Sequence, residues 1–161
     1  MGRLFPGLPT DAAFEALRSD LEPWRPAIKA IAARHGLERT ARLFDQGSCV
    51  LFGVGDLWVV KLFEPWFVAH YHTERALLVP VDGALPVPAP RLHGADIIEG
   101  WGYVVMSRLA GNALNQEREA LGPTDRIRIA HQVGALGAAR HATPVTGLDS
   151  LATSWPSSIA E

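Results

Sequence analysis

The sequence contains little of what several classes of protein require. Its single cysteine, Cys49, excludes an internal disulfide and a cysteine-based zinc motif. No apolar run reaches the roughly 18 residues that a membrane helix needs, and the opening MGRLFPGLPTDAAF lacks the apolar core of a signal peptide. Lys and Arg number 15 against 17 Asp and Glu, so there is no basic excess for nucleic acid. These absences predict a cytoplasmic chain that binds neither a membrane nor nucleic acid.

The composition that remains is typical of an ordinary globular protein, with 48% hydrophobic and 20% charged residues. Apolar residues recur at helical spacing in the first forty positions, at Phe14, Leu17 and Leu21 and again at Ile28 and Ile31. We expect residues 1–40 to form helices that serve packing.

From about residue 41 the pattern changes to that of strands. The segment ARLFDQGSCVLFGVGDLWVVKLF predicts three antiparallel strands, separated by turns at residues 45–48 and at Gly53 to Asp56. A helix is expected within residues 64–81, and two more strands should flank a turn at Glu99 to Gly102. The resulting order is β-β-β-α-β-β, an α+β fold with a five-stranded antiparallel sheet and one packed helix.

The segment after Leu109 is polar and contains glycine, which is typical of a linker, and TDRIRIAHQVGALGAARHA again has a helical period. We therefore divide the chain into residues 1–40, 41–109 and 110–161.

One charged residue, Lys61, lies in the apolar run LWVVKLF. A buried lysine is stable only if its ammonium group is paired or reaches a wet cleft. Glu74, on the helix expected to pack against the same sheet, is the obvious partner. The alternatives are an edge-strand lysine whose head reaches water, and a glutamate on an ordinary solvated helix face.

A strand lysine held by a helix glutamate beneath a turn of small residues is the arrangement that kinases use to hold the phosphates of ATP. Gly47 would let the backbone approach a phosphate, and Ser48 could donate its hydroxyl and N–H groups. Val59, two residues before Lys61, would cover the adenine.

The segment VVMSRLAG would then be the last strand and the hinge. Met106 would line the back of the adenine pocket, and the main chain of Ser107 and Leu109 would offer hydrogen bonds to the edge of the base.

Several segments in this order resemble the amino-terminal half of aminoglycoside phosphotransferase-like kinases, a group that includes choline and fructosamine kinases. They are GSCVLFGVGDLWVVKLF, HTERALL, LPVPAPRLHG, YVVMSRLAGNAL and IAHQVGALGAARHATPV, between about Ala41 and Val145. The resemblance implies a protein-kinase-like N-lobe in residues 41–109, with N-terminal helices before it and the start of a helical C-lobe after it. It also implies that Lys61 binds phosphate, that Glu74 is its partner, and that Ser48 supplies the loop hydroxyl.

The nucleotide loop departs from the G-x-G-x-x-G pattern of protein kinases, which favours a small-molecule kinase. The family's H-G-D-x-x-x-x-N segment and later Asp motif are absent, because the HGL at His35 and the HGA at His93 lack the Asp. We therefore expect ATP as cofactor, no catalytic residue in this chain, and magnesium ligands in a missing lobe that would also bind the hydroxyl substrate. A fragment of a longer kinase is favoured over a naturally short form.

Two functions stay open after the sequence alone. The first is the ATP-binding lobe of a small-molecule kinase. The second is a noncatalytic binding or regulatory module that buries its open face on a second copy or a partner chain.

Overall fold

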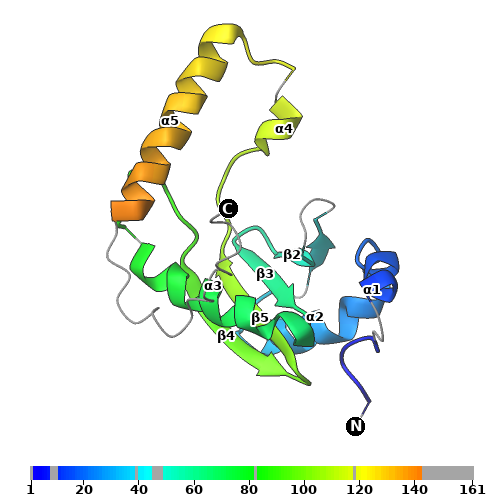
Figure 1. Ribbon diagram of the computed structural model, residues 1–161. Coiled ribbons are helices and arrows are strands. Elements are labelled where there is room, and N and C mark those ends of the chain that lie inside the picture. Colours follow the sequence, from blue (N-terminus) through cyan, green and yellow to red (C-terminus); the bar gives the residue numbers. More distant parts are fainter. Residues whose placement is uncertain are drawn as a thin grey trace, which may run out of the picture.

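The computed structural model describes residues 2–7, 11–38, 40–44, 49–81, 83–117 and 119–142 (Figure 1). Along the chain its elements are α1 (Asp11–Leu17), the 3-10 helix η1 (Glu22–Trp24), α2 (Arg25–Arg34), β1 (Ala41–Leu43), β2 (Leu51–Val54), β3 (Trp58–Phe63), the 3-10 helix η2 (Pro65–Phe67), α3 (Val68–Val81), β4 (Leu92–Ile98), β5 (Trp101–Ser107), α4 (Leu114–Glu117) and α5 (Pro123–Ala142).

The five strands form one antiparallel sheet in the order β1-β2-β3-β5-β4, which confirms the predicted sheet and its packed helix. Two predicted turns were misplaced. Gly53 lies inside β2 opposite Val59, and the chain turns after it, where Gly55 has a φ of 56°. Trp101 already begins β5, so the last hairpin turns tightly at Glu99 and Gly100, whose φ values of 52° and 84° are both positive.

The N-terminal helices cover one face of the sheet, which we call the back face. Alternation along β3 directs Val60 and Leu62 to this side. The helix residue Trp24 is fully buried and packs edge-on against Trp101 of β5. Phe5 stacks on the same Trp101 ring with a centroid distance of 5.1 Å. The back face is therefore closed by an aromatic core.

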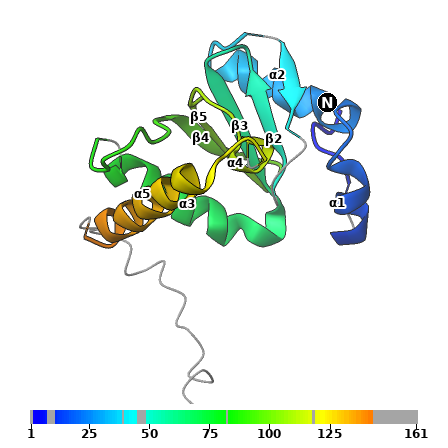
Figure 2. The same cartoon turned by 90° about the horizontal axis from the view of Figure 1, so that it is seen from above.

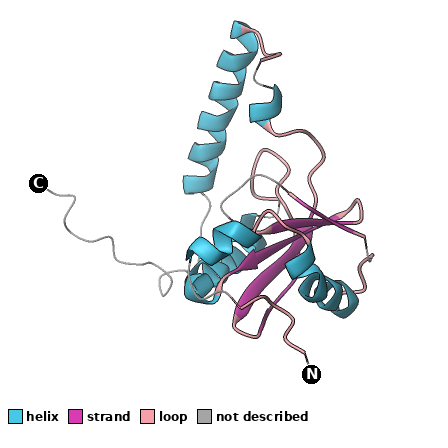
Figure 3. Cartoon of the chain, turned by 90° about the vertical axis from the view of Figure 1, so that its right-hand side faces the viewer, coloured by secondary structure: helices cyan, strands magenta, loops and turns pink. Residues whose placement is uncertain are grey.

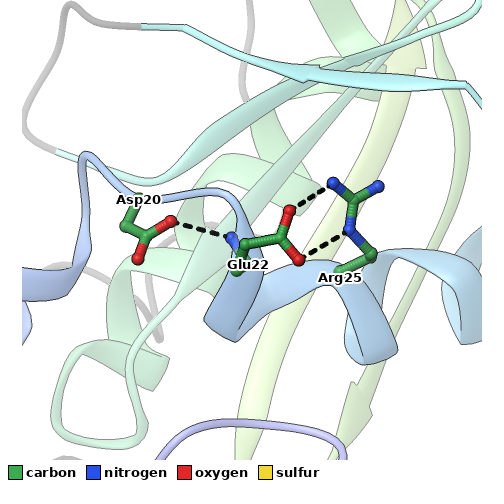
Figure 4. Close-up of polar contacts among 3 residues, drawn as sticks. All are labelled: Asp20, Glu22 and Arg25. Atoms are coloured by element: carbon green, nitrogen blue, oxygen red, sulfur yellow. Dashed lines mark hydrogen bonds and ion pairs between the residues drawn. The ribbon is translucent and has the colours of Figure 1, made fainter.

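Three polar residues lie where the chain passes from α1 to η1 and α2 (Figure 4). The Asp20 carboxylate accepts a hydrogen bond from the backbone N–H of Glu22 at 3.0 Å, where η1 begins. The Glu22 carboxylate accepts from Arg25 Nε at 3.1 Å, and this hydrogen bond lowers the pKa of Glu22. Both side chains are exposed, so their contribution is to local geometry more than to stability.

The opposite side of the sheet, the front face, carries Val59, Lys61 and Phe63 of β3 and is covered by α3. Figure 2 shows the strands between α2 on one side and α3 on the other. The helix comes very close at Gly102, where a Cβ atom would lie 2.7 Å from Cγ of Tyr71. A glycine at this position of β5 therefore sets how closely α3 packs.

Beyond the sheet, α4 and α5 extend away from the two layers (Figures 1 and 3). The single-turn α4 lies in the segment predicted as a linker, and sequence patterns did not reveal it. None of the described side chains of α5 is buried. Within the described part of the chain, no helix has both the length and the apolar character to cross a membrane.

Candidate functional site

Lys61 and Glu74 form an ion pair that joins the sheet to α3. Lys61 lies on β3 and Glu74 lies about two turns into α3. The exposed fractions of the Lys61 and Glu74 side chains are 20% and 29%, so both are mostly buried but remain partly accessible to solvent. The predicted pairing is confirmed, and the alternative of an edge-strand lysine is wrong because β3 lies between β2 and β5.

The surroundings of Lys61 explain why a charge is tolerated in an apolar strand. Its neighbours across the sheet are Leu51 of β2 and Val104 of β5. Its Nζ atom lies 5.0 Å from the ring centroid of Phe63, close enough for a cation–π contact. A carboxylate, an aromatic face and partial contact with water together replace the lost hydration of the ammonium group.

Val59 and Met106 lie directly opposite each other on β3 and β5. Both belong to the apolar cluster of the front face, with exposed fractions of 9% and 8%. Residues two apart on a strand share a face, so this pair is adjacent to Lys61. The structure therefore brings four of the predicted site residues together. The apolar pair of Val59 and Met106 lies beside the ion pair of Lys61 and Glu74.

Main-chain hydrogen bonds fix the end of β5, where Ser107 and Leu109 were predicted to contact a ligand. The Ser107 N–H group donates to the carbonyl of Arg91 at 2.9 Å, and the Arg91 N–H donates back to Ser107 Oγ at 2.9 Å. The Arg108 N–H group donates to the carbonyl of Leu57 at 2.7 Å. The Ser107 N–H group is thus bonded to Arg91, so the predicted main-chain contacts to a ligand would come from the Ser107 carbonyl and from Leu109.

Gly47 and Ser48, the predicted residues of the loop between β1 and β2, lie outside the described residues. Cys49, the next residue, is partly buried.

Three front-face residues were missed by sequence reasoning: Arg42, Phe44 and Arg108. The guanidinium carbons of Arg42 and Arg108 lie 5.5 Å and 6.0 Å from the centroid of the Phe44 ring. Alternation along β1 indicates that Arg42 and Phe44 share a face. The prediction of a turn at Gly53 concealed which residues of the next strand lie beside them. With Gly53 inside β2, Arg42 lies in the same cross-strand row as Val59 and Met106.

A separate groove of about 570 Å³ lies between α4 and α5 and contains none of the predicted site residues. Its lining is apolar and includes Leu114, Ile129 and Val133. No group of three His, Cys, Asp or Glu side chains among the described residues could hold a metal ion.

Comparison with protein families gives a match to a model described as the phosphotransferase enzyme family, over residues 49–156. The comparison with curated proteins gave no match.

Solved structures with a similar fold include wild-type aminoglycoside 2'-phosphotransferase-IIIa with GDP, at 17% identity and a TM-score of 0.61, covering 77% of this chain and 42% of that chain. An APH(2") enzyme with GDP and kanamycin has 17% identity and a TM-score of 0.61, with 78% and 43% covered. APH(2")-IIa with streptomycin and ATP has 11% identity and a TM-score of 0.55, with 90% and 44% covered. The chain thus spans less than half the length of these structures, and at such identities the likeness establishes the fold, that of a protein-kinase-like N-lobe.

Proposed function

Because the chain belongs to the phosphotransferase enzyme family, whose model matches residues 49–156, we propose that residues 41–109 form the ATP-binding lobe of a small-molecule kinase. The whole protein would transfer the γ-phosphoryl group of ATP to a substrate hydroxyl. Similar structures with GDP or ATP support nucleotide binding on this fold.

The observation that carries the proposal is the ion pair between Lys61 and Glu74. In kinases a strand lysine held by a helix glutamate contacts the phosphates of the nucleotide. Glu74 would keep the ammonium group directed along the front face, and Lys61 would neutralise phosphate oxygens. A lysine without this partner would bind phosphate less tightly, since its flexible side chain would lose more entropy on binding.

The apolar residues beside this pair would hold the base. Val59 would cover one face and Met106 would line the back of the pocket, since both lie next to Lys61 on the front face. The Leu109 N–H and the Ser107 carbonyl would contact the edge of the base. Gly47 and Ser48 would contribute main-chain and hydroxyl groups to the phosphates.

Magnesium would accompany the nucleotide and neutralise phosphate charge during transfer. The described residues do not form a magnesium site by themselves. The segment H-G-D-x-x-x-x-N, which would supply the catalytic Asp and the Asn, is absent from these 161 residues. The proposal therefore assigns to this chain the binding and orientation of nucleotide, and no proton transfer.

Calorimetric titration with ATP and magnesium tests the proposal on the wild type, on Lys61→Met and on Lys29→Met. The chain has only two lysines, and Lys29 is exposed on α2 behind the sheet, so its variant is a matched control. A charged hydrogen bond contributes about 1.5–3 kcal/mol, so Lys61→Met should weaken binding by about 10- to 150-fold. Lys29→Met should bind like the wild type.

Equal binding by Lys61→Met and the wild type would contradict the proposed role of Lys61. Failure of every variant to bind, with thermal unfolding showing an intact fold, would favour the noncatalytic module instead. In that case sedimentation of the purified chain should show a species heavier than the monomer.

A further inference from the structure

Residues 2–7, which we call the strap, contain no helix or strand of their own, yet they are fixed to the back face of the sheet. The Phe5 side chain is 2% exposed and stacks on the Trp101 ring with an angle of 5° between the ring planes. The Leu4 side chain packs against the same hydrophobic cluster. Apolar contacts therefore dock the strap on β5.

One carboxylate also fastens the backbone of the strap. The Glu99 carboxylate accepts hydrogen bonds from the Leu4 N–H at 3.1 Å to each oxygen and from the Phe5 N–H at 3.3 Å. Glu99 lies in the turn between β4 and β5 with a φ of 52°, the only positive φ of a non-glycine residue in the described part of the chain. Asn adopts this conformation more readily than Glu does. The turn alone does not explain a glutamate here, whereas the reach of its carboxylate to the strap does.

The same turn contacts the beginning of α3 on the other side of the sheet. Of residues 99–102, the first and the third hold the strap, and the second and the fourth lie against the front-face helix. A Cβ atom on Gly100 would lie 3.7 Å from Cγ of Pro65, in the 3-10 helix that leads into α3. A Cβ atom on Gly102 would lie 2.7 Å from Cγ of Tyr71. Residues 99–102 are therefore held between the strap and α3.

Tyr71 connects this turn to the ion pair of the proposed nucleotide site. Its side chain is buried, and its ring packs edge-on against Phe63 of β3 with a centroid distance of 5.9 Å. Glu74 follows Tyr71 by about one turn of α3, and Lys61 lies two residues before Phe63. Packed side chains and a rigid helix can carry a displacement from one site to another. The position of residues 99–102 therefore influences where Glu74 meets Lys61.

We propose that Glu99 and Phe5 are positioning residues for the pair of Lys61 and Glu74, because they dock the strap and so hold residues 99–102 against α3. The inference rests on the proposed nucleotide site and adds a control of that site from the opposite face of the sheet. Release of the strap should let the start of α3 move and should lower the affinity for ATP. Because such coupling is reciprocal, bound ATP should tighten the docking of the strap.

Calorimetric titration with ATP and magnesium tests the coupling on Glu99→Asn and Glu99→Gln. Asn suits the positive φ of the turn, but its shorter, uncharged side chain should not hold the strap. ATP binding should therefore weaken by about 5-fold or more, from the lower end of common coupling factors upwards. Gln keeps the length and one acceptor oxygen and should retain most of the affinity. Glu22→Asn, at another exposed carboxylate of the back-face layer, is the control and should bind like the wild type.

Amide hydrogen exchange, followed by NMR, measures the docking of the strap directly. Glu99→Asn should speed the exchange of the Leu4 and Phe5 amides. In the wild type, saturating ATP with magnesium should slow both amides by about the factor that release of the strap costs in ATP affinity. The Asp20 N–H, which donates to the Leu17 carbonyl at 3.0 Å, is the control and should exchange at the same rate with and without ATP.

Two results would overturn the inference while the proposed function stands. One is ATP binding by Glu99→Asn that equals the wild type. The other is exchange at Leu4 and Phe5 that ATP leaves unchanged, or slows no more than at Asp20, which would make the strap a purely structural part of the back face. The exchange experiment on the wild type needs no variant, so it decides the question even if a variant fails to fold.

Failure of the proposed function has a different signature. If the wild type does not bind ATP, or if Lys61→Met binds ATP as well as the wild type does, the proposed nucleotide site fails and the inference fails with it.

Discussion

The two faces of the sheet differ in the side chains that they carry. Among the described residues, a cluster of fifteen buried hydrophobic side chains closes the back face, including Trp24, Trp101 and Tyr103. The front face has six buried hydrophobic residues in its cluster and also carries an ion pair and two arginines over an aromatic ring. Because neighbouring residues on each strand point to opposite faces, the same strands contribute to both faces. We infer that stability resides mainly on the back face, while the proposed nucleotide site lies on the front face.

The largest effect should come from Trp24→Ala on the back face. Trp24 is fully buried, and its indole Nε1–H donates to the Leu17 carbonyl at 3.0 Å. Removal of so large a buried ring typically costs about 3–5 kcal/mol. Trp66→Ala is the control, since Trp66 is 43% exposed beside the front-face helix and should change stability by only about 0.5 kcal/mol. Urea unfolding measures both, and equal losses would contradict the division between the faces.

A smaller effect is expected where α3 meets the sheet. Gly102→Ala would place a methyl group 2.7 Å from Cγ of Tyr71, so α3 must move outward. Overpacking of this kind costs about 1–3 kcal/mol. Tyr71 precedes Glu74 by about one turn, so the shift should also draw Glu74 away from Lys61 and weaken ATP binding.

Gly134→Ala on α5 is the matched control for Gly102→Ala. No atom lies within 4 Å of the added methyl group, and alanine favours a helix over glycine by about 0.5–1 kcal/mol. We expect no loss of stability and no change in ATP affinity. Unchanged ATP binding in Gly102→Ala would show that the pair does not depend on the close packing of α3.

The smallest effect should be a pH dependence of stability that comes from His35, on the back side of the sheet. Burial, followed by the positive charges of His93 and Arg34, lowers the pKa of His35 below its usual 6.5, while Asp96 opposes this shift. His35 also shares a hydrogen bond of 3.0 Å with the hydroxyl of Tyr103. The folded state therefore binds a proton less readily than the unfolded chain does.

The free energy of unfolding should consequently fall as the pH drops through about 6.5, and it should level off below the folded-state pKa of His35. Thermal unfolding between about pH 5 and 8 measures this slope around the ordinary histidine pKa. His35→Gln should flatten the slope even if it lowers stability at every pH. A slope that persists in this variant would assign the titration to another group.

Much of the fold followed from local pattern. The strands and α3 were predicted from the alternation and spacing of apolar residues, and the isolated charge of Lys61 led directly to Glu74. The misplaced turn at Gly53 shows the limit of such patterns, because a glycine that allows close packing inside a strand has the same sequence signature as a turn. That error also hid Arg42 and Phe44.

The sequence by itself thus determined the order of the five strands and α3, the membership in the phosphotransferase family and the need of Lys61 for a partner. These depend on local periodicity and on the high free energy of an unpaired buried charge. Only the tertiary structure decided that Ser107 uses its N–H within the sheet, that α3 packs on Gly102, and that Arg42 and Arg108 meet at Phe44. The physical reason is that cross-strand pairing and the packing of α3 bring together side chains that lie far apart along the chain, and these contacts exist only once the sheet has formed.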